Sequence, residues 1–355
     1  MISNKLPNME GAVCPLPLAH SEQIMLGHGS GGKLSHDLIQ KLFLPAFANP
    51  VLLAGDDAGA VQINDYTKLA ISTDSHVVSP LFFPGGDIGR LAVCGTVNDV
   101  AMLGALPRYL TAGFILEEGL EVEILQRVIA SMQQAAAEAG IQIVAGDTKV
   151  VQKGKADGLY INTTGVGVIT AGTQIGGAQA RPGDAILLSG PIGDHGIAVL
   201  SARGELGFEA DIRSDVAPLN HLVAALLEAS NQVHVLRDPT RGGLATSLNE
   251  IARQSGVCLM IEEDRIPVQP AVRAACEMLG FDPLFVANEG KLIAILPQAE
   301  ADNVLLAMRK SPYGEQAIRI GEVREAPQSR VLMKTTLGTT RIVDMLAGEM
   351  LPRIC

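Results

Sequence analysis

Residues 181–190 read RPGDAILLSG, and this stretch marks the start of a second folding unit. It predicts a turn, then an apolar strand, then a glycine-containing turn. The chain has 355 residues, of which 47% are hydrophobic, and this length favours two domains over one. We therefore place a domain boundary within residues 172–181 and expect a mixed α/β (α+β) unit on each side.

The domain limits follow from the patterns around this boundary. Residues 24–172 are expected to form an N-terminal domain, and residues 181–345 a C-terminal domain. Residues 1–23 lack the basic start and apolar run of a signal peptide, and we expect a flexible leader. Residues 346–355 follow the last regular segment, and we expect a flexible tail that ends in Cys355.

The clearest predicted element is a helix over residues 121–139, with Gly140 as its C-cap. Helical periodicity also predicts helices over residues 34–48, 87–104, 196–203, 218–229, 243–255, 270–279 and 298–309. Alternating or apolar runs predict strands over residues 67–73, 141–145, 158–169, 257–262, 283–287, 291–296, 317–323 and 329–334.

The composition argues against several classes of protein. The formal net charge is −11 and no run rich in Lys and Arg occurs, so nucleic acid is not an expected partner. No stretch of about 18 apolar residues occurs, so no membrane helix is expected. The five cysteines are scattered without a CxxC pair, which indicates free thiols in a reducing cytoplasm rather than disulfides or a zinc site.

Five short segments each present an aspartate, and we expect it at a strand end or helix start. They are GDDAGAV (55–61), STDS (72–75), VNDVAMLG (97–104), GDTKVV (146–151) and RDPTRGG (237–243). Taken singly, each aspartate is more readily explained as an N-cap or turn residue. Taken together, they favour a site for magnesium (Mg²⁺), which prefers oxygen ligands and typically joins carboxylates to substrate phosphates.

The segment GHGSGGK (27–33) is the candidate phosphate-binding loop. The glycines Gly29, Gly31 and Gly32 allow backbone N–H groups to converge on anionic oxygens, and Lys33 adds positive charge before a predicted helix. Neither the P-loop spacing nor the dinucleotide-binding fingerprint is present. A flexible turn that binds nothing is the alternative interpretation.

The order of these motifs resembles a known superfamily. GHGSGGK, DDAG, STDS, VNDVAMLGA, GDTK, GDHG, RDPTRGG and NEGK resemble the ATP-binding superfamily of aminoimidazole ribonucleotide synthetase, selenophosphate synthetase and thiamine-phosphate kinase. The terminal PRIC further resembles the HypE family of hydrogenase maturation factors, which are carbamoyl dehydratases. The resemblance extends from about Ile24 to Cys355.

The resemblance implies a two-domain fold in which the first domain dimerises through its sheet and ATP lies in the adjacent cleft. It implies that Asn98 and Asp147 lie beside the nucleotide. It also implies Mg²⁺-binding carboxylates at four positions, which are Asp56, Asp74, Asp99 and Asp238.

The final residues, LPRIC (351–355), are the candidate carrier of a reacting group. Pro352 disfavours a helical conformation at Leu351, so we expect a short extended arm. The terminal carboxylate beside the Cys355 thiol should raise its pKa above the usual value of about 8.5. Such a thiol suits a carried group better than a resting nucleophile. A terminal cysteine without any function is the alternative interpretation.

The resemblance also implies a reaction. The carbamoyltransferase HypF places a carbamoyl group on the Cys355 sulfur, and ATP-dependent dehydration converts it to a thiocyanate. The cyano group then passes to iron on the HypC–HypD complex and becomes a ligand of the [NiFe]-hydrogenase centre. A cation near the carbamoyl oxygen and a base for the nitrogen proton are needed. Lys149 and Glu289 are the candidates, without an assignment between the two roles, and a surface ion pair is their alternative.

Two other functions are weighed against this one. Another synthetase of the superfamily would act on a free small molecule, although selenophosphate synthetase would need a reactive cysteine in a glycine-rich loop that here has none. A scaffold with a C-terminal docking peptide would tolerate Cys355→Ser, provided that the carboxylate is kept. His195, in GDHG, either faces the nucleotide or caps a helix.

Overall fold

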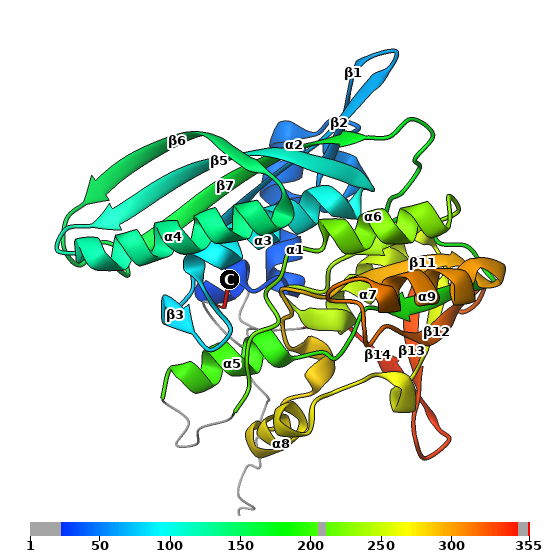
Figure 1. Cartoon of the computed structure of the whole chain (residues 1–355). Coiled ribbons are helices and arrows are strands. Elements are labelled where there is room, and N and C mark those ends of the chain that lie inside the picture. Colours follow the sequence, from blue (N-terminus) through cyan, green and yellow to red (C-terminus); the bar gives the residue numbers. More distant parts are fainter. Residues whose placement is uncertain (1–22, 205–210, 347–353) are drawn as a thin grey trace, which may run out of the picture.

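A computed structural model describes residues 23–204, 211–346 and 354–355, which form two domains, each with its own sheet (Figure 1). In Figure 1 the sheet of the first domain lies above helices α3 and α4, and the second domain lies below them. The C-terminus lies between the two domains. The expected two-domain α/β architecture is therefore the observed one.

The first domain has a five-stranded sheet in the order β1-β2-β7-β5-β6. Only β5 and β6 run parallel, because helix α4 connects them. Its strands are β1 Gly59–Asn64, β2 Thr67–His76, β5 Ala105–Glu117, β6 Gln142–Val151 and β7 Leu159–Ile169, with a small hairpin of β3 Phe82–Phe83 and β4 Gly86–Asp87. Its helices are α1 Lys33–Leu38, a π-helical turn Ile39–Phe43, α2 Leu44–Phe47, α3 Ile88–Met102 and α4 Val122–Ala139, with 3₁₀ turns at Leu26–Gly29 and Leu52–Ala54.

Helices α3 and α4 cover the inner face of this sheet, and they differ in how much of their surface is buried. The Asp87 side chain caps α3 by accepting hydrogen bonds from the backbone N–H groups of Gly89 and Arg90, and almost every residue of this helix is buried. Helix α4 buries one stripe and ends at Gly140, whose φ of 69° is left-handed, as the sequence predicts. Helix α3 therefore becomes the central element between the sheet and the second domain.

The strand register places the aspartates of β2 and β6 on opposite faces of the first sheet. Asp74 pairs with Thr163, which pairs with Ala112, which in turn pairs with Gly146. Asp147 is one residue further on, and successive residues of a strand point to opposite faces. Thr163 and Ala112 are buried, and the Thr163 hydroxyl donates a hydrogen bond to a carbonyl of α3. Asp74 therefore lies on the helix-covered face, and Asp147 lies on the outward face.

The outward face of the first sheet carries exposed apolar side chains. No helix of the described residues covers it in Figure 1. The register assigns to this face Ile71 of β2, Leu106, Tyr109 and Ile115 of β5, and Val168 of β7, all of them exposed. A contiguous apolar surface of this kind commonly marks an interface.

The second domain has a seven-stranded sheet in the order β14-β13-β10-β12-β8-β11-β9. Its strands are β8 Asp184–Leu188, β9 Val235–Arg237, β10 Cys258–Glu262, β11 Ile293–Pro297, β12 Ile318–Arg324, β13 Arg330–Lys334 and β14 Thr340–Val343. Its helices are α5 Asp194–Ala202, α6 Asn220–Ala229, α7 Gly243–Ser255, α8 Pro270–Leu279 and α9 Ala301–Lys310, with 3₁₀ turns at Glu263–Arg265, Pro283–Phe285 and Gln298–Glu300. The stretch RPGDAILLSG leads into β8, which is buried along its whole length.

Two expectations about local structure were wrong, and one strand was not predicted. Residues 283–287 contain a 3₁₀ turn instead of a strand, because the Asp282 side chain caps it and Pro283 occupies its first turn. The motifs STDS and GDTK lie inside β2 and β6 and not at strand ends. The long strand β5 was not predicted, because Pro107 and Gly113 interrupt its apolar pattern.

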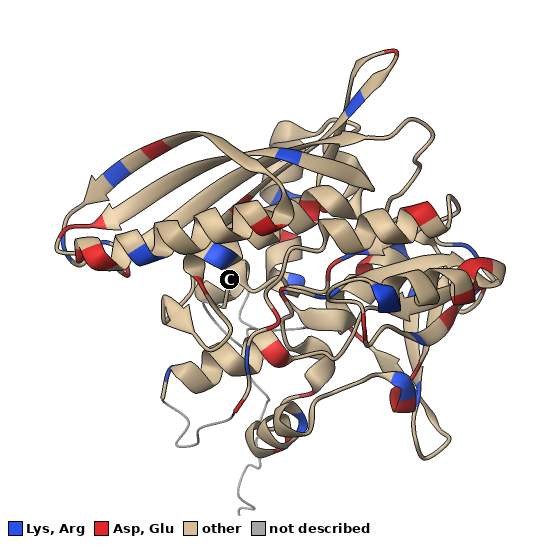
Figure 2. Cartoon of the chain, viewed as in Figure 1, with Lys and Arg blue, Asp and Glu red and all other residues tan. Residues whose placement is uncertain are grey.

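The charged side chains are dispersed over both domains, as Figure 2 shows. Within the described ranges, no helix combines the length and the apolar character needed to cross a bilayer.

Candidate active site

The last two residues of the chain are inserted between the domains. Ile354 is 4% exposed, and its carbonyl accepts a hydrogen bond of 2.9 Å from His195 Nε2. Cys355 packs against the hydrophobic core that the first sheet forms with α3 and α4. Of the predicted flexible tail (346–355), residues 347–353 lie outside the described residues, and so do residues 1–22 of the predicted leader (1–23).

The Cys355 thiol lies beside a buried glutamate and an arginine. Burial raises the pKa of this thiol well above its usual value, the charges of Glu289 and Asp74 and a hydrogen bond with Glu289 raise it further, and Arg241 opposes them. The same direction was expected from the terminal carboxylate, but burial is the larger cause. The thiol is therefore protonated at neutral pH in this position.

Glu289 is a buried carboxyl group next to the thiol. It is 3% exposed, and its Oε1 has no hydrogen-bond partner within the described part of the chain. Burial raises its pKa well above the ordinary value, and the charges of Asp238, Asp74 and Asp215 raise it further. A carboxyl group of this kind, buried in a cleft beside a thiol, is a candidate for proton transfer.

A rigid loop before β11 positions Glu289. The Asn288 side chain accepts a hydrogen bond from Gly193 N–H at 2.7 Å and donates one to the carbonyl of Pro239 at 2.8 Å. The backbone N–H of Glu289 donates to Asp215 Oδ1 at 3.0 Å. These bonds connect the loop to the start of α5, to the motif RDPTRGG and to the segment before α6, so the glutamate has little freedom to move.

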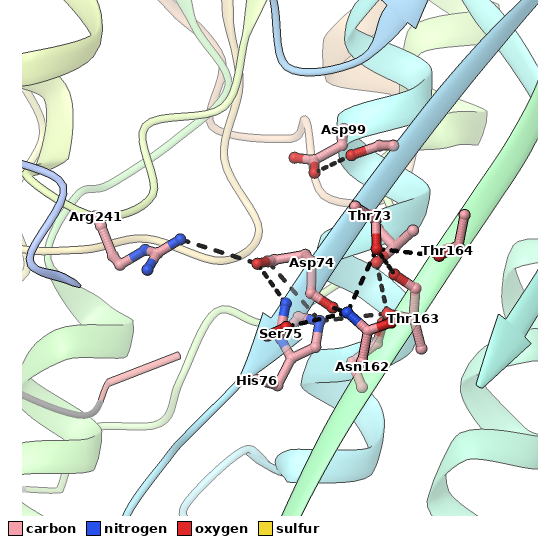
Figure 3. A network of polar contacts seen from close by, with 12 residues as sticks. Thr73, Asp74, Ser75, His76, Asp99, Asn162, Thr163, Thr164 and Arg241 are labelled. Atoms are coloured by element: carbon pink, nitrogen blue, oxygen red, sulfur yellow. Dashed lines mark hydrogen bonds and ion pairs between the residues drawn. The ribbon is translucent and has the colours of Figure 1, made fainter. Parts of the chain in front are cut away.

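Carboxylates from both domains form an acidic cluster next to Glu289, which we define as Asp57, Asp74, Asp99 and Asp238. Ser72 Oγ donates a hydrogen bond to Asp99 Oδ2 at 2.7 Å, and Figure 3 shows Asp99 close to Asp74. Burial raises the pKa of Asp99 well above its ordinary value, and the other three carboxylates of the cluster add to this shift. Burial and the charge of Asp57 do the same for Asp238, although Arg237 opposes them.

In the pair Asp56-Asp57, the structure turns the second residue toward the cluster. Asp56 Oδ1 accepts a hydrogen bond from Gly177 N–H at 2.7 Å and so holds the segment between the domains. Asp57 pairs with Arg237 Nη1 at 2.6 Å, yet burial raises its pKa to about 6. Sequence reasoning missed Asp57, and the only available signal was the doubled aspartate.

Arg241 is a second residue that sequence reasoning missed, although it lies in the quoted motif RDPTRGG. Its Nη1 donates to the carbonyl of Gly29 at 3.2 Å, and its Nη2 lies 3.9 Å from Asp74 Oδ1 (Figure 3). Its charge also opposes the rise in the pKa of Cys355. One guanidinium group thus connects the glycine-rich loop, the acidic cluster and the thiol.

The glycine-rich loop packs closely against Arg241 on one side and Leu346 on the other. A Cβ atom at Gly31, where φ is +77°, would lie 2.7 Å from Arg241 Cβ, and one at Gly32 would lie 2.5 Å from the carbonyl oxygen of Leu346. That same oxygen accepts a hydrogen bond from Lys33 N–H at 2.9 Å. The two glycines are therefore required by close packing within this chain, whether or not the loop binds phosphate.

Three predicted site residues lie away from the thiol or have other partners. Asn98 is buried and joins α3 to the second domain, because its side chain donates to the carbonyl of Ala217 at 3.0 Å and accepts from Leu219 N–H at 2.8 Å. Asp147 and Lys149 form an exposed ion pair of 2.6 Å on the outward face of the first sheet. The structure therefore brings together Asp74, Asp99, Asp238, Glu289 and Cys355, and it separates Asp147 and Lys149 from them.

The acidic cluster fits a divalent cation by its chemistry. Its carboxylates repel one another, and Asp238 Oδ2 is buried without a hydrogen-bond partner among the described residues. Within those residues, no three His, Cys, Asp or Glu side chains surround one point as a finished metal centre. This arrangement suits Mg²⁺ shared with phosphate oxygens, because Mg²⁺ commonly takes one or two carboxylates and keeps other oxygen ligands.

Comparisons with known proteins identify the class to which this fold and site belong. The family model described as AIR synthase related protein, N-terminal domain, matches residues 55–169, and the one for the C-terminal domain matches residues 181–334. The chain is thus a two-domain protein of the AIR synthase related class.

The relatives within this class are more specific. The carbamoyl dehydratase HypE of Cupriavidus necator is 58% identical over 335 residues, which cover 94% of this chain and 95% of that protein. A crystal structure of a HypE–HypF complex is similar with a TM-score of 0.83 at 50% identity, covering 87% of this chain and 99% of that one. A crystal structure of HypE in complex with ATP has a TM-score of 0.78 at 55% identity, covering 94% and 100%. The chain belongs to the HypE family of carbamoyl dehydratases.

This membership confirms the family that the ordered motifs and the terminal PRIC predicted. It also decides between the activities weighed from the sequence, in favour of the carbamoyl dehydratase and against a synthetase acting on a free small molecule or a scaffold.

Proposed function

We propose that this site dehydrates a carbamoyl group carried on the Cys355 sulfur and leaves a thiocyanate on the same atom. One observation carries the proposal: the last side chain of the protein lies between the domains, beside Glu289 and the acidic cluster. Family membership provides the reaction class, and the inserted thiol provides the carrier. We further propose that this chemistry supplies the cyanide ligand for the iron of the [NiFe]-hydrogenase centre.

In the proposed reaction, the carbamoyl oxygen leaves as phosphate rather than as hydroxide, so ATP cleavage drives the loss of water. The carbamoyl oxygen attacks the γ-phosphate of ATP and displaces ADP. The carbon–oxygen bond then breaks, both nitrogen protons are lost, and S–C≡N remains. A solved structure of a HypE protein holds ATP, which supports the nucleotide as co-substrate here.

Glu289 is the proposed base for the nitrogen protons. Its raised pKa makes it a stronger base than a surface glutamate once it is ionised, and its carboxyl group is close enough to Cys355 to form a hydrogen bond with the thiol. Its buried Oε1 has no hydrogen-bond partner among the described residues, which leaves one oxygen available to a carried group. Within one chain, the positive charge that acts on the thiol is that of Arg241, whereas Lys149 is exposed and paired with Asp147.

Asp74, Asp99 and Asp238 are the proposed ligands of Mg²⁺, together with Asp57, and Asp56 is proposed to orient the segment between the domains instead. When bound, the cation would neutralise the triphosphate and hold the γ-phosphate in line for attack. The glycine-rich loop, with Gly29, Gly31, Gly32 and Lys33, is the proposed cover of the phosphates. Asn98 is proposed to act indirectly, because its hydrogen bonds to Ala217 and Leu219 fix helix α3 against the second domain next to the proposed nucleotide site.

The proposed Mg²⁺ site has a test that does not need the reaction. Asp238→Asn should weaken the binding of a fluorescent ATP analogue in the presence of Mg²⁺ and have little effect in EDTA. A variant with the same change at the exposed Asp302 is the control. Equal losses of affinity with and without Mg²⁺ would contradict the assignment of Asp238 as a metal ligand.

Lys149 and Asp147 retain a proposed role only in a homodimer. Both lie on the outward face of the first sheet, whose exposed apolar side chains support dimerisation through this face. In that arrangement Asp147 and Lys149 would approach the site of a second copy. The other proposed partners are HypF, supported by the solved HypE–HypF complex, and the HypC–HypD complex as acceptor of the cyano group, all in the cytoplasm.

The test of this function is the intact mass of the C-terminal peptide. The full chain is incubated with HypF, carbamoyl phosphate and ATP, and the second step is repeated with a non-hydrolysable ATP analogue. We expect a carbamoyl adduct on Cys355 that loses one water only when ATP is cleaved. If Cys355 stays unmodified while ATP is hydrolysed upon addition of a free small molecule, the carrier role is wrong. Cys355→Ser controls for modification elsewhere.

A further inference from the structure

His195 connects the inserted C-terminus to the interior of the second domain. The ring is completely buried at the start of α5, and both of its nitrogen atoms have a partner. Its Nδ1 lies 2.8 Å from Ser214 Oγ, and its Nε2 lies 2.9 Å from the carbonyl oxygen of Ile354. The histidine therefore neither faces the nucleotide through a free nitrogen nor caps α5 with its side chain, which were the two roles weighed from the sequence.

The two partners of His195 determine which nitrogen carries the proton, because the carbonyl oxygen of Ile354 can only accept a hydrogen bond and so requires the proton on Nε2. Val216 N–H donates to Ser214 Oγ at 3.1 Å, so the single hydroxyl proton of Ser214 is available for His195 Nδ1. With Nδ1 as acceptor, the neutral ring carries its proton on Nε2, and this is the atom that faces the carbonyl of Ile354. Burial lowers the pKa of His195 and so favours this neutral form.

The ring is also fixed in orientation by the first domain. Phe83 contacts it edge-on, with a centroid distance of 5.4 Å and an interplanar angle of 87°. The backbone N–H of Ser214 donates to the carbonyl of Pro84 at 2.7 Å. A donor that Ser214 and Phe83 orient before the C-terminal residues bind loses little conformational freedom when they do.

We propose that His195 is a positioning residue that holds Ile354 and Cys355 between the domains and so determines how the thiol divides its time between loading and dehydration. The hydrogen bond to Ile354 fixes the backbone immediately before Cys355, and hence the place of the thiol beside Glu289. His195 does not touch the reacting atoms, because its two nitrogen atoms are used by Ser214 and Ile354. The consequence for turnover rests on the proposed carrier function, whereas the holding of the arm does not.

Holding the arm has opposite consequences for the two steps. A partner enzyme that loads the thiol must reach a side chain that is here only partly exposed between the two domains. Dehydration needs the same thiol beside Glu289. Weakening the bond to Ile354 should therefore speed loading and slow dehydration, whereas general damage to the fold would slow both.

The histidine can be replaced by two amides that separate its two hydrogen bonds. The side-chain nitrogen of Gln reaches the position of Nε2, and that of Asn reaches only the position of Nδ1. His195→Gln should therefore keep the bond to Ile354, and His195→Asn should lose it, while both lose the aromatic ring beside Phe83. Ser214→Ala removes the partner of Nδ1 and should fall between them.

The measurement is the rate at which iodoacetamide alkylates Cys355 in the full chain, read from the mass of the C-terminal peptide. We expect His195→Asn to raise this rate about five-fold, since one net hydrogen bond is worth about 1 kcal/mol, and His195→Gln to stay within about two-fold of the native chain. Equal rates in all three chains, or an equal rise in Asn and Gln, would overturn the proposal. Thermal unfolding of each variant shows whether it is folded, and Ser214→Ala provides an independent reading.

A second assay then separates this proposal from the proposed function. In single-turnover experiments, His195→Asn should accelerate carbamoylation by HypF and slow the ATP-dependent loss of water, and His195→Gln should change neither by much. If alkylation follows the expected order but no chain ever loses water, the carrier function is wrong and the role of His195 in holding the arm stands. If loading and dehydration both slow in His195→Asn, the holding role is wrong.

Discussion

The segment NEGK before β11 and the segment GDTK within β6 are similar in sequence, and the fold treats them in opposite ways. Glu289 is 3% exposed and is held by its neighbours beside Cys355. Lys149 is 68% exposed at its side chain and pairs only with Asp147 among the described residues. The glutamate of NEGK thus has its neighbours within its own chain, whereas the charged side chains of GDTK are exposed to solvent.

The difference in burial between Glu289 and Lys149 indicates which chemistry a single chain can support. Buried charges need partners, and the second domain supplies them around Glu289 with backbone and side-chain bonds. The charges on β6 are solvated and carry no such constraint. Within one chain, Glu289 is therefore the group that can take part in chemistry away from water. For the exposed Lys149, the proposal is that it acts in the site of a second chain.

The largest expected effect tests the buried segment. Glu289→Gln keeps the shape of the side chain but removes the base, so dehydration of carbamoylated Cys355 should slow by about 10²–10⁴-fold. Carbamoylation by HypF should be nearly unchanged, because it does not use this carboxylate. The C-terminal peptide mass in single-turnover reactions reports both steps. Glu262→Gln, on the partly exposed end of β10, is the control, and an equal loss in both variants would count against Glu289 as the base.

The next effect tests the exposed segment. Lys149→Ala should slow dehydration by about 10²-fold if the lysine stabilises the charge on the carbamoyl oxygen. Stability should change by less than about 0.5 kcal/mol, because the residue is exposed. Lys155→Ala is the control on the neighbouring turn. The rates are measured on preloaded protein.

Mixed dimers test whether Lys149 acts in the site of its own chain or in the site of the other chain of the dimer. A mixture of Lys149→Ala and Cys355→Ser chains should regain activity, because the intact thiol of one chain would meet the intact lysine of the other. Lack of recovery in proven mixed dimers would place the lysine in the site of its own chain and remove the contrast with Glu289.

A smaller effect tests the outward face itself. Ile115 pairs with Lys149 across the parallel strands and is 43% exposed. Ile115→Glu would bury a charge in the proposed interface and should weaken dimerisation about tenfold or more. Sedimentation at several protein concentrations measures this change. Met278→Glu, at an exposed position of α8, should leave it unaltered, and a native chain that is monomeric throughout would refute the interface.

The smallest expected effect concerns pH. Burial and the charge of Asp215 raise the pKa of Asp194 to about 7, although Lys291 opposes them, whereas hydrogen bonds with Lys149 and with the backbone of Thr148 lower the pKa of the exposed Asp147. The folded state thus holds the proton of Asp194 more tightly than the unfolded state does. The native chain should therefore lose stability, on the order of 1 kcal/mol, as the pH rises from about 4 to about 7.

Asp194→Asn should lack this loss, so that its free energy of unfolding by urea varies less between pH 5 and pH 8 than that of the native chain. Asp302→Asn at the exposed start of α9 serves for comparison. An identical pH dependence in all three chains would show that Asp194 is not protonated in the fold.

The sequence predicted regular elements well where one local signal dominates. The helix ending at Gly140 and the strand of residues 158–169 were confirmed within one or two residues. Strand β5 was missed, because its pattern makes sense only between two neighbouring strands. The turn at Pro283–Phe285 was read as a strand, because a short apolar run does not reveal whether its backbone is extended.

The candidate site was predicted in part. Asp74, Asp99, Asp238, Glu289 and Cys355 were selected from motifs, and the structure places them together. Other residues were missed or left without a definite role for reasons of geometry, because adjacent aspartates point in different directions and because an arginine or histidine of this kind is recognised only by its distant partners. These residues are Asp57, Arg241 and His195.

By itself, the sequence determined the order of motifs, the two α/β domains and a thiol at the last position, because these depend on local patterns and on covalent order. Only the tertiary structure decided that Asp74 and Asp147 lie on opposite faces of one sheet, since a shift of one residue in a strand reverses the direction of the side chain. It also decided that the terminal thiol lies beside Glu289 and that His195 hydrogen-bonds to Ile354, because these contacts join residues that are far apart in the chain.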